Sequence, residues 1–104
     1  MDKIDHDNII AFRLRQARTD KGISQKNLGI LAGIDEFSAS PRINQYERGK
    51  HIPDLSILRN LGKILNVPAS YFSTDSDQLA ELIILFHRSN QQNKEKIFDL
   101  LKSL

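Results

Sequence analysis

Cysteine is absent from the 104 residues of this chain, and long hydrophobic runs are absent too. Without cysteine the chain can form neither a disulfide nor a thiolate metal site, which fits the reducing cytoplasm where we expect the protein to work. No apolar run reaches the roughly 18 residues that a membrane-spanning helix needs. The first seven residues are acidic and lack the apolar segment of a signal peptide.

Signs of catalysis are equally scarce. The three histidines, His6, His51 and His87, lie far apart, and none has a neighbour at a metal-ligand spacing. The five glycines are scattered, whereas a phosphate-binding loop groups them. The adjacent pair Asp35 and Glu36 has the surroundings of a solvated turn. A chain of this length has no room for a large catalytic cleft, so we expect neither an enzyme nor a bound cofactor or metal.

Positive charge is concentrated in one part of the chain. Residues 8–63 contain ten Lys and Arg against five Asp and Glu, whereas residues 1–7 and 64–104 each have a small negative excess. The overall net charge of +2 hides this asymmetry. Such a distribution favours a polyanionic partner, although a merely soluble surface can have the same composition.

Apolar periodicity predicts two helices in the first third of the chain. One is capped by Asp7 or Asn8 and stops at Gly22, and its buried stripe recurs at i, i+4 and i+7, at Ile10, Leu14 and Ala17. The basic residues Arg13, Arg15 and Lys21 are expected on the remaining, solvent-facing side. The next has Ser24 as its N-cap and closes at Gly33. A glycine inside that helix, Gly29, costs roughly 1 kcal/mol relative to alanine and indicates that another helix approaches closely there.

A third helix is predicted to end at Gly49, but its start is ambiguous. Ser40 is one possible cap, with Pro41 at the first helical position, and Ser38 is the other. Residues 34–40 read as a connection of turn-forming residues with one aromatic, Phe37.

A fourth helix follows from Asp54 to Leu65, and Asn66 suits a left-handed C-cap. Its inner face is expected at Leu55, Leu58, Leu61 and Leu65. Residues 67–72 form a short helical turn whose aromatic pair, Tyr71 and Phe72, closes the core. The polar residues 73–76 mark a boundary, so we expect one domain over residues 8–72 and an appended segment over residues 77–104.

The appended segment contains two further helical patterns, joined by the polar residues 89–93. Apolar residues recur at helical spacing in both, at Leu79, Leu82, Ile83 and Phe86 and at Ile97, Leu100, Leu101 and Leu104. Ile84 and Leu85 make the first helix apolar nearly all round, so it must be covered on more than one side. The pattern predicts an antiparallel hairpin covered by a second subunit. The alternative is that both helices fold back on the preceding domain.

The most specific pattern lies in residues 41–50. Ile43 and Tyr46 share one side of the predicted third helix, where they would pack against the core. Polar and exposed positions lie on the other side, at Pro41, Gln45 and Arg48, flanked by Arg42 and Asn44. A helix with forked and amide donors above a packed side meets the requirements for reading the major groove of DNA.

In order and spacing these residues resemble the helix-turn-helix domain of the Cro/cI and xenobiotic-response-element (XRE) family of bacterial and phage regulators. The resemblance covers roughly residues 10–72. Its motifs are Leu14-Arg15-Gln16-Ala17-Arg18, Lys21-Gly22-Ile23-Ser24-Gln25, Leu28, Gly33-Ile34, Ile43-Asn44-Gln45-Tyr46-Glu47-Arg48-Gly49-Lys50, and Pro53, Leu55, Leu58, Leu65 and Val67. It implies an all-α, five-helix, lambda-repressor-like domain, here with a C-terminal helical hairpin.

The resemblance also implies roles for individual residues. Arg18 and Glu47 match a pair that bridges the first and third helices. The positions that match base contacts are Ser40, Pro41, Arg42, Asn44 and Gln45. Those that match phosphate contacts are Ser24, Gln25, Arg48 and Lys50, because the free N–H groups of a helix N-terminus favour phosphate and basic residues clamp the backbone. Dimerisation is expected from the hairpin residues Leu79, Leu82, Ile83, Phe86, Ile97, Leu100 and Leu101.

The chain departs from the family pattern between Gly33 and Glu47, where it has about four extra residues. We expect an expanded loop there, with Phe37 tucked beneath it and Ser38 close enough to reach DNA. The function implied is a dimeric repressor that binds double-stranded DNA at a near-palindromic operator. Two alternatives stay open, an antitoxin that binds a toxin and its own operator, and an adaptor that binds only protein.

Overall fold

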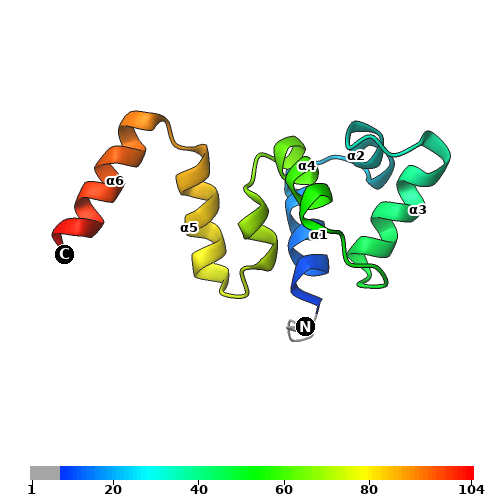
Figure 1. The fold of residues 1–104 in the computed structure, drawn as a ribbon, viewed down its shortest axis with the longest axis horizontal. Coiled ribbons are helices and arrows are strands. Elements are labelled where there is room, and N and C mark those ends of the chain that lie inside the picture. Colours follow the sequence, from blue (N-terminus) through cyan, green and yellow to red (C-terminus); the bar gives the residue numbers. More distant parts are fainter. Residues whose placement is uncertain (1–7) are drawn as a thin grey trace.

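The computed structural model describes residues 8–104, and every regular element in that part of the chain is a helix (Figure 1). The elements are α1 (Ile9–Lys21), α2 (Gln25–Leu31), α3 (Glu36–Glu47), α4 (Leu55–Leu65), the 3-10 turn η2 (Ala69–Ser73), α5 (Asp77–Arg88) and α6 (Gln91–Ser103). The all-α prediction is confirmed, with a 3-10 turn as the fifth element of the domain. The molecule measures 50 × 29 × 23 Å, with α3 near one end and α6 at the other.

The helix boundaries follow from local chemistry at most positions. The Ser24 hydroxyl accepts a hydrogen bond from the Asn27 amide at 3.0 Å, and Asp54 caps α4 in the same way at 2.9 Å. Gly22 and Asn66 end their helices in the left-handed conformation, with φ of 75° and 57°. Asn8 is the N-cap residue of α1, and its rival for that position, Asp7, lies outside the described residues.

The hydrophobic core lies between α1, α2, α3, α4 and η2. Its fully enclosed side chains come from each of these elements and include Leu14, Leu28, Ile43, Leu61, Leu65, Tyr71 and Phe72. The predicted aromatic closure of the core by η2 is therefore confirmed. The prediction that Leu55 faces inward is wrong, since this first residue of α4 is 53% exposed.

The predicted start of α3 is wrong. Neither Ser38 nor Ser40 is the N-cap, because α3 begins at Glu36 after the N-cap Asp35. The extra residues between Gly33 and Glu47 therefore add one helical turn to α3 and do not expand the loop. Phe37 is not tucked beneath a loop either, since its side chain is 87% exposed.

Tertiary packing explains why α3 begins more than a turn before its proline. Pro41 lies inside α3, where it cannot donate a hydrogen bond to the carbonyl of Phe37 one turn earlier. Ala39, between these two residues, is fully buried, and its burial stabilises the first turn.

The two C-terminal helices differ in how they meet the domain. In α5 the buried residue is Ala80, which packs on the core near η2, and Arg88 donates hydrogen bonds to the carbonyls of Leu65 and Asn66. In α6 no residue is buried, and Figure 1 shows this helix diverging from α5 beyond the connector. The hairpin is therefore open, with one helix against the domain and the other projecting from it.

Arg13 is a departure from the periodic pattern, which placed it on the solvent side of α1. It is 4% exposed and donates from Nε to the Thr74 carbonyl at 2.8 Å. Its Nη1 lies 3.0 Å from the Asp77 carboxylate at the start of α5. The acceptors that make this burial tolerable come from more than 60 residues further along the chain, so α1 alone gives no sign of them.

Candidate nucleic-acid interface

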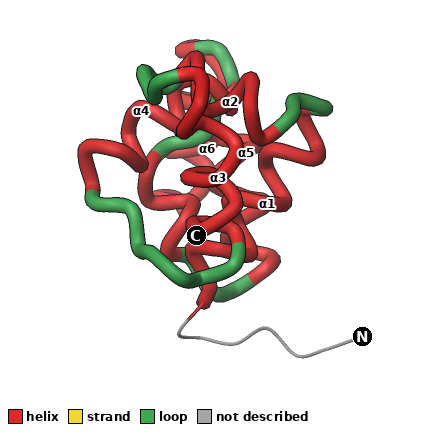
Figure 2. Tube along the Cα trace, turned by 90° about the vertical axis from the view of Figure 1, so that its right-hand side faces the viewer, coloured by secondary structure: helices red, strands yellow, loops and turns green. Residues whose placement is uncertain are grey.

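The position of α3 depends on its close contact with α2. A Cβ atom added at Gly29 would lie 2.7 Å from the Cβ of Ala39 and 2.9 Å from the Ala39 backbone, which is closer than real atoms approach. Only glycine permits this crossing, so the predicted close approach at Gly29 is confirmed. Figure 2, which views the molecule from the α3 end, shows α3 in front of the rest of the domain.

A polar network fixes the C-terminal half of α3. Arg18 of α1 donates from Nε and Nη2 to the two carboxylate oxygens of Glu47, at 2.5 and 3.0 Å. The third nitrogen, Nη1, donates to the Ile23 carbonyl at 3.0 Å. The side chain of Glu47 is 3% exposed and that of Arg18 is 15% exposed, so the pair is largely shielded from water. A bidentate pair of this kind fixes orientation as well as distance.

Gln25 joins this network from the first position of α2. Its amide donates to Glu47 Oε1 at 3.1 Å and to Asn44 Oδ1 at 3.3 Å. One carboxylate thus links three helices, because Glu47 of α3 accepts hydrogen bonds from Arg18 of α1 and Gln25 of α2. The arrangement holds α3 at a set angle before any ligand is bound.

The C-terminal end of α3 is fixed against the start of α1. Gly49 has a φ of 72°, and a Cβ there would lie 2.2 Å from Asn8 Oδ1. The amides of Lys50 and His51 both point to the carbonyl of Gln45, at 3.0 and 3.4 Å. Lys50 and His51 are exposed just beyond this turn.

The residues matched to base contacts differ in their accessibility. Pro41 and Arg42 are exposed, and Gln45 is half-buried on the same outer side of α3. Asn44 is half-buried and accepts the hydrogen bond from Gln25, so its carbonyl oxygen is occupied within the protein. Ser40 is also half-buried. Pro41 and Arg42 are therefore the most accessible of the five, and Gln45 lies half-buried beside them on the outer side of α3.

The residues matched to phosphate contacts lie at two helix ends. Ser24 and Gln25 begin α2, where Ser24 caps the helix and Gln25 braces α3. Arg48 and Lys50 are exposed at the exit of α3. Both pairs thus lie on elements that flank the outer side of α3.

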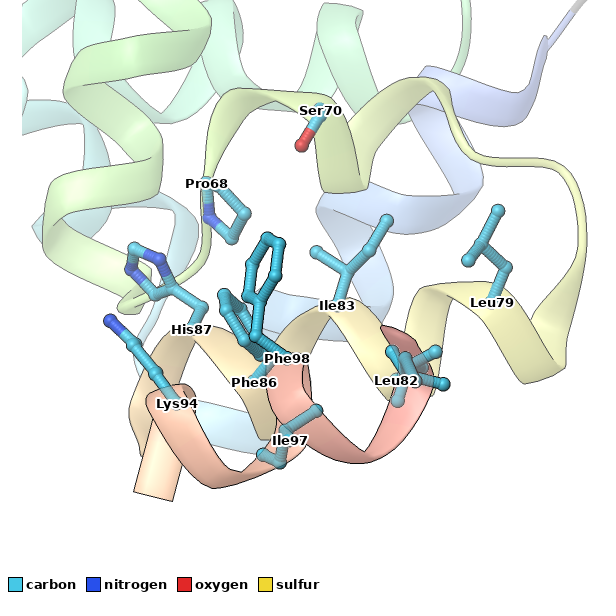
Figure 3. A pocket seen from close by; sticks show the side chains of 11 residues that line it. Pro68, Ser70, Leu79, Leu82, Ile83, Phe86, His87, Lys94, Ile97 and Phe98 are labelled. Atoms are coloured by element: carbon cyan, nitrogen blue, oxygen red, sulfur yellow. The ribbon is translucent and has the colours of Figure 1, made fainter. Parts of the chain in front are cut away.

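The residues matched to dimerisation lie at the other end of the molecule. Leu79, Leu82, Ile83, Phe86, Ile97 and Leu101 line a groove of about 430 Å³ between α5 and α6, which Pro68 and Ser70 close on the side of the domain (Figure 3). The Phe86 and Phe98 rings meet across it, with centroids 6.0 Å apart. Leu100, the remaining residue of the predicted set, does not line the groove and is exposed on α6.

Two residues near these surfaces were missed at the level of sequence. The sequence pattern predicts a buried Phe37 and a surface Arg13, whereas in the structure Phe37 is exposed and Arg13 is buried. Among residues 8–104, no three His, Asp or Glu side chains come together to hold a metal ion. None of the described helices combines the length and apolar character required to cross a membrane.

Comparison with known proteins agrees with this arrangement. The sequence model of the helix-turn-helix family, HTH_3, matches residues 14–72. An HTH-type transcriptional regulator of Sinorhizobium medicae (strain WSM419) is 39% identical over 67 residues, which are 64% of this chain and 45% of that protein. The chain thus spans less than half the length of that relative.

Two further matches extend over most of both chains. The SPbeta prophage-derived HTH-type transcriptional regulator YonR of Bacillus subtilis (strain 168) is 32% identical over 102 residues, covering 86% of this chain and 91% of YonR. The crystal structure of the transcriptional regulator BswR superposes with a TM-score of 0.85 at 41% identity, covering 90% of this chain and 93% of that one. The chain belongs to the XRE-type helix-turn-helix family of transcriptional regulators.

Proposed function

We propose that this protein binds duplex DNA sequence-specifically and represses transcription by occupying an operator. The observation that supports this best is the braced α3, whose outer side presents Pro41, Arg42 and Gln45 while Glu47 ties its inner side to α1 and α2. A rigid helix that needs no rearrangement loses little entropy when it enters a groove. This function requires only that the protein binds DNA, so we propose no enzymatic activity. As a regulator of transcription, it would act in the cytoplasm, where bacterial DNA lies.

The exposed side chains suit separate parts of a DNA site. Arg42 can donate to guanine O6 and N7, and Gln45 can pair with adenine N6 and N7. Arg48 and Lys50 at the helix exit suit phosphate oxygens, which position a protein without specifying sequence. The N-terminus of α2 at Ser24 and Gln25 offers free backbone N–H groups to a phosphate of the other strand.

We further propose that residues 8–72 form the DNA-binding domain and residues 77–104 the dimerisation element. α6 has no buried residue of its own, and its apolar side chains lie open beside the groove of α5. A second copy of the chain would cover both helices in a two-fold symmetric contact. Such a dimer would place two α3 helices on half-sites about 34–36 Å apart, on a near-palindromic operator.

The first experiment is selection from a pool of random duplexes at two salt concentrations. Recovery of a palindrome with steep salt dependence supports the proposal, because phosphate contacts release counterions. If no sequence is enriched, the DNA-reading role is wrong and a protein-binding adaptor becomes the better explanation.

Two matched variants distinguish base recognition from phosphate contact on the selected site. Arg42→Ala should weaken binding by about 1–3 kcal/mol on that site only, whereas Lys50→Ala should weaken all duplexes alike and flatten the salt dependence. Both side chains are exposed, so neither variant should alter folding. Unchanged affinity in both variants contradicts the proposed docking of α3.

The open groove between α5 and α6 also supports the antitoxin alternative, because a toxin could bind at the surface where we propose the second copy. Light scattering of the purified chain tests this directly. A stable dimer supports the symmetric contact, whereas a monomer indicates that the groove awaits a different protein.

A further inference from the structure

Phe37 is the most exposed aromatic side chain among the described residues. It is 87% exposed and lies in the first turn of α3, the turn that the extra residues add. An aromatic ring in water at the tip of a braced helix contributes nothing to the stability of the domain, since burial is what stabilises it. Its position calls for a role outside the protein core.

Helix geometry places Phe37 on the outer side of α3. It precedes Pro41 by four residues and Gln45 by eight, and at 3.6 residues per turn each step of four rotates the side chain by only about 40°. Ala39, which packs on Gly29, lies on the opposite side of the same turn. The outer strip of α3 therefore begins at Phe37 and continues through Pro41 to Gln45.

The charged residues around this turn leave the strip free of a competing carboxylate. The Glu36 carboxylate lies 3.7 Å from Lys26 Nζ on α2, in an exposed ion pair. Asp35 accepts a hydrogen bond from the Ser38 hydroxyl at 3.0 Å. The acidic side chains at the start of α3 thus have partners within the protein, and the outer strip at this end is apolar.

We propose that Phe37 is a specificity-determining residue that contacts the 5-methyl group of a thymine in the major groove. That methyl is the one apolar group on the major-groove edges of the four bases, and it is matched by an apolar side chain. Four residues of helix rise by about 6 Å, so Phe37 reaches one to two base pairs beyond the pair contacted from Pro41. This inference rests on the proposed DNA-binding function.

Thymine-to-uracil substitution in the selected operator tests the contact, because uracil lacks only the methyl group. We expect one thymine in each half-site whose replacement weakens binding by the wild-type protein about four-fold, the loss that corresponds to one buried methyl-sized group. Phe37→Ala should bind the original operator about ten-fold more weakly and show no further loss at that thymine. Phe37→Leu, which keeps an apolar side chain, should retain part of the sensitivity.

The matched control is Leu31→Ala, which removes another exposed apolar side chain, from the end of α2 and outside the α3 strip. It should leave operator affinity within about two-fold of wild type. If Arg42→Ala weakens binding but Phe37→Ala does not, DNA binding stands and the thymine contact is wrong. If Phe37→Ala weakens binding yet keeps the full response to uracil, the ring contacts something other than that methyl, and the inference also fails. If the wild-type protein selects no site, both proposals fall together.

Discussion

The N-terminal head, residues 8–73, and the C-terminal tail, α5 and α6, have the same amphipathic helical pattern but differ in how much of it is buried. In the head, α1 to α4 and η2 each bury side chains in a common core. In the tail, α5 buries Ala80 and α6 buries nothing. An apolar stripe therefore predicts that a helix will be covered, but it does not say by which chain.

The largest expected contrast is between two phenylalanines, one in each region. Phe72 is fully enclosed in the head, and its replacement by alanine should lower the free energy of unfolding by about 3–5 kcal/mol, because it removes buried surface and leaves a cavity. Phe98 in α6 is 54% exposed and contacts Phe86. Phe98→Ala should therefore lower the free energy of unfolding of a single chain by no more than about 1 kcal/mol.

Urea unfolding followed by circular dichroism, at a concentration where the protein is monomeric, measures both values. Sedimentation at higher concentration should show weaker self-association for Phe98→Ala and not for a variant outside the tail. Equal losses of stability for the two variants would mean that the tail belongs to the core of the protomer.

The next contrast concerns two glutamates. Glu47→Ala would strand Arg18, which is 15% exposed, and leave Gln25 without one acceptor, so we expect a loss of about 2–3 kcal/mol in unfolding free energy. Glu95 in α6 is exposed, and Glu95→Ala should change stability by under about 0.5 kcal/mol. Chemical denaturation checks both, and a negligible effect of Glu47→Ala would show that the network does not brace α3.

Much of the head follows from local sequence signals. Ser24, Asp54 and Asn66 have the chemistry of caps, and each one caps its helix in the structure. Gly29 is unfavourable within a helix and so signals the close contact that the structure places there. These signals are short-range, which is why a pattern of a few residues is enough to detect them.

The errors arise where distant residues decide the outcome. A proline after serine favours a helix start at Pro41, but the burial of Ala39 against Gly29 extends the helix one turn earlier. Arg13 has the periodicity of a surface residue, and its partners Thr74 and Asp77 are remote in sequence. The candidate base and phosphate contacts came from the family resemblance, and the structure adds which of them are accessible.

Arg13 joins the two regions together with Ala80 and Arg88, so its removal should loosen the tail from the head. Arg13→Ala loses the hydrogen bond to the Thr74 carbonyl, and we expect about 1–2 kcal/mol less stability together with faster amide exchange in α5. Asp77→Ala removes the ion pair to the buried Arg13 guanidinium but keeps its hydrogen bond to Thr74. Because the Asp77 side chain is 75% exposed, water can replace the carboxylate, and we expect a smaller loss of under about 1 kcal/mol. Exchange in α5 that is unaffected by Arg13→Ala would show that Ala80 and Arg88 suffice to hold the tail on the head.

The smallest expected effect is a pH dependence at the same junction. Burial raises the pKa of the Tyr71 hydroxyl above its ordinary value of 10.0, against the opposing influence of nearby Arg13. The folded state therefore favours the neutral phenol, and this stabilisation is present below about pH 10 and is lost as the pH rises through the raised pKa. Tyr71→Phe cannot ionise, so the wild-type protein should lose stability relative to this variant above about pH 10. Lysine deprotonation affects both proteins alike, and the difference between their unfolding free energies isolates Tyr71. A difference that stays constant from pH 8 to about pH 11 would mean that the phenolate is tolerated where head and tail meet, and that this junction is more open to water than the burial of Tyr71 indicates.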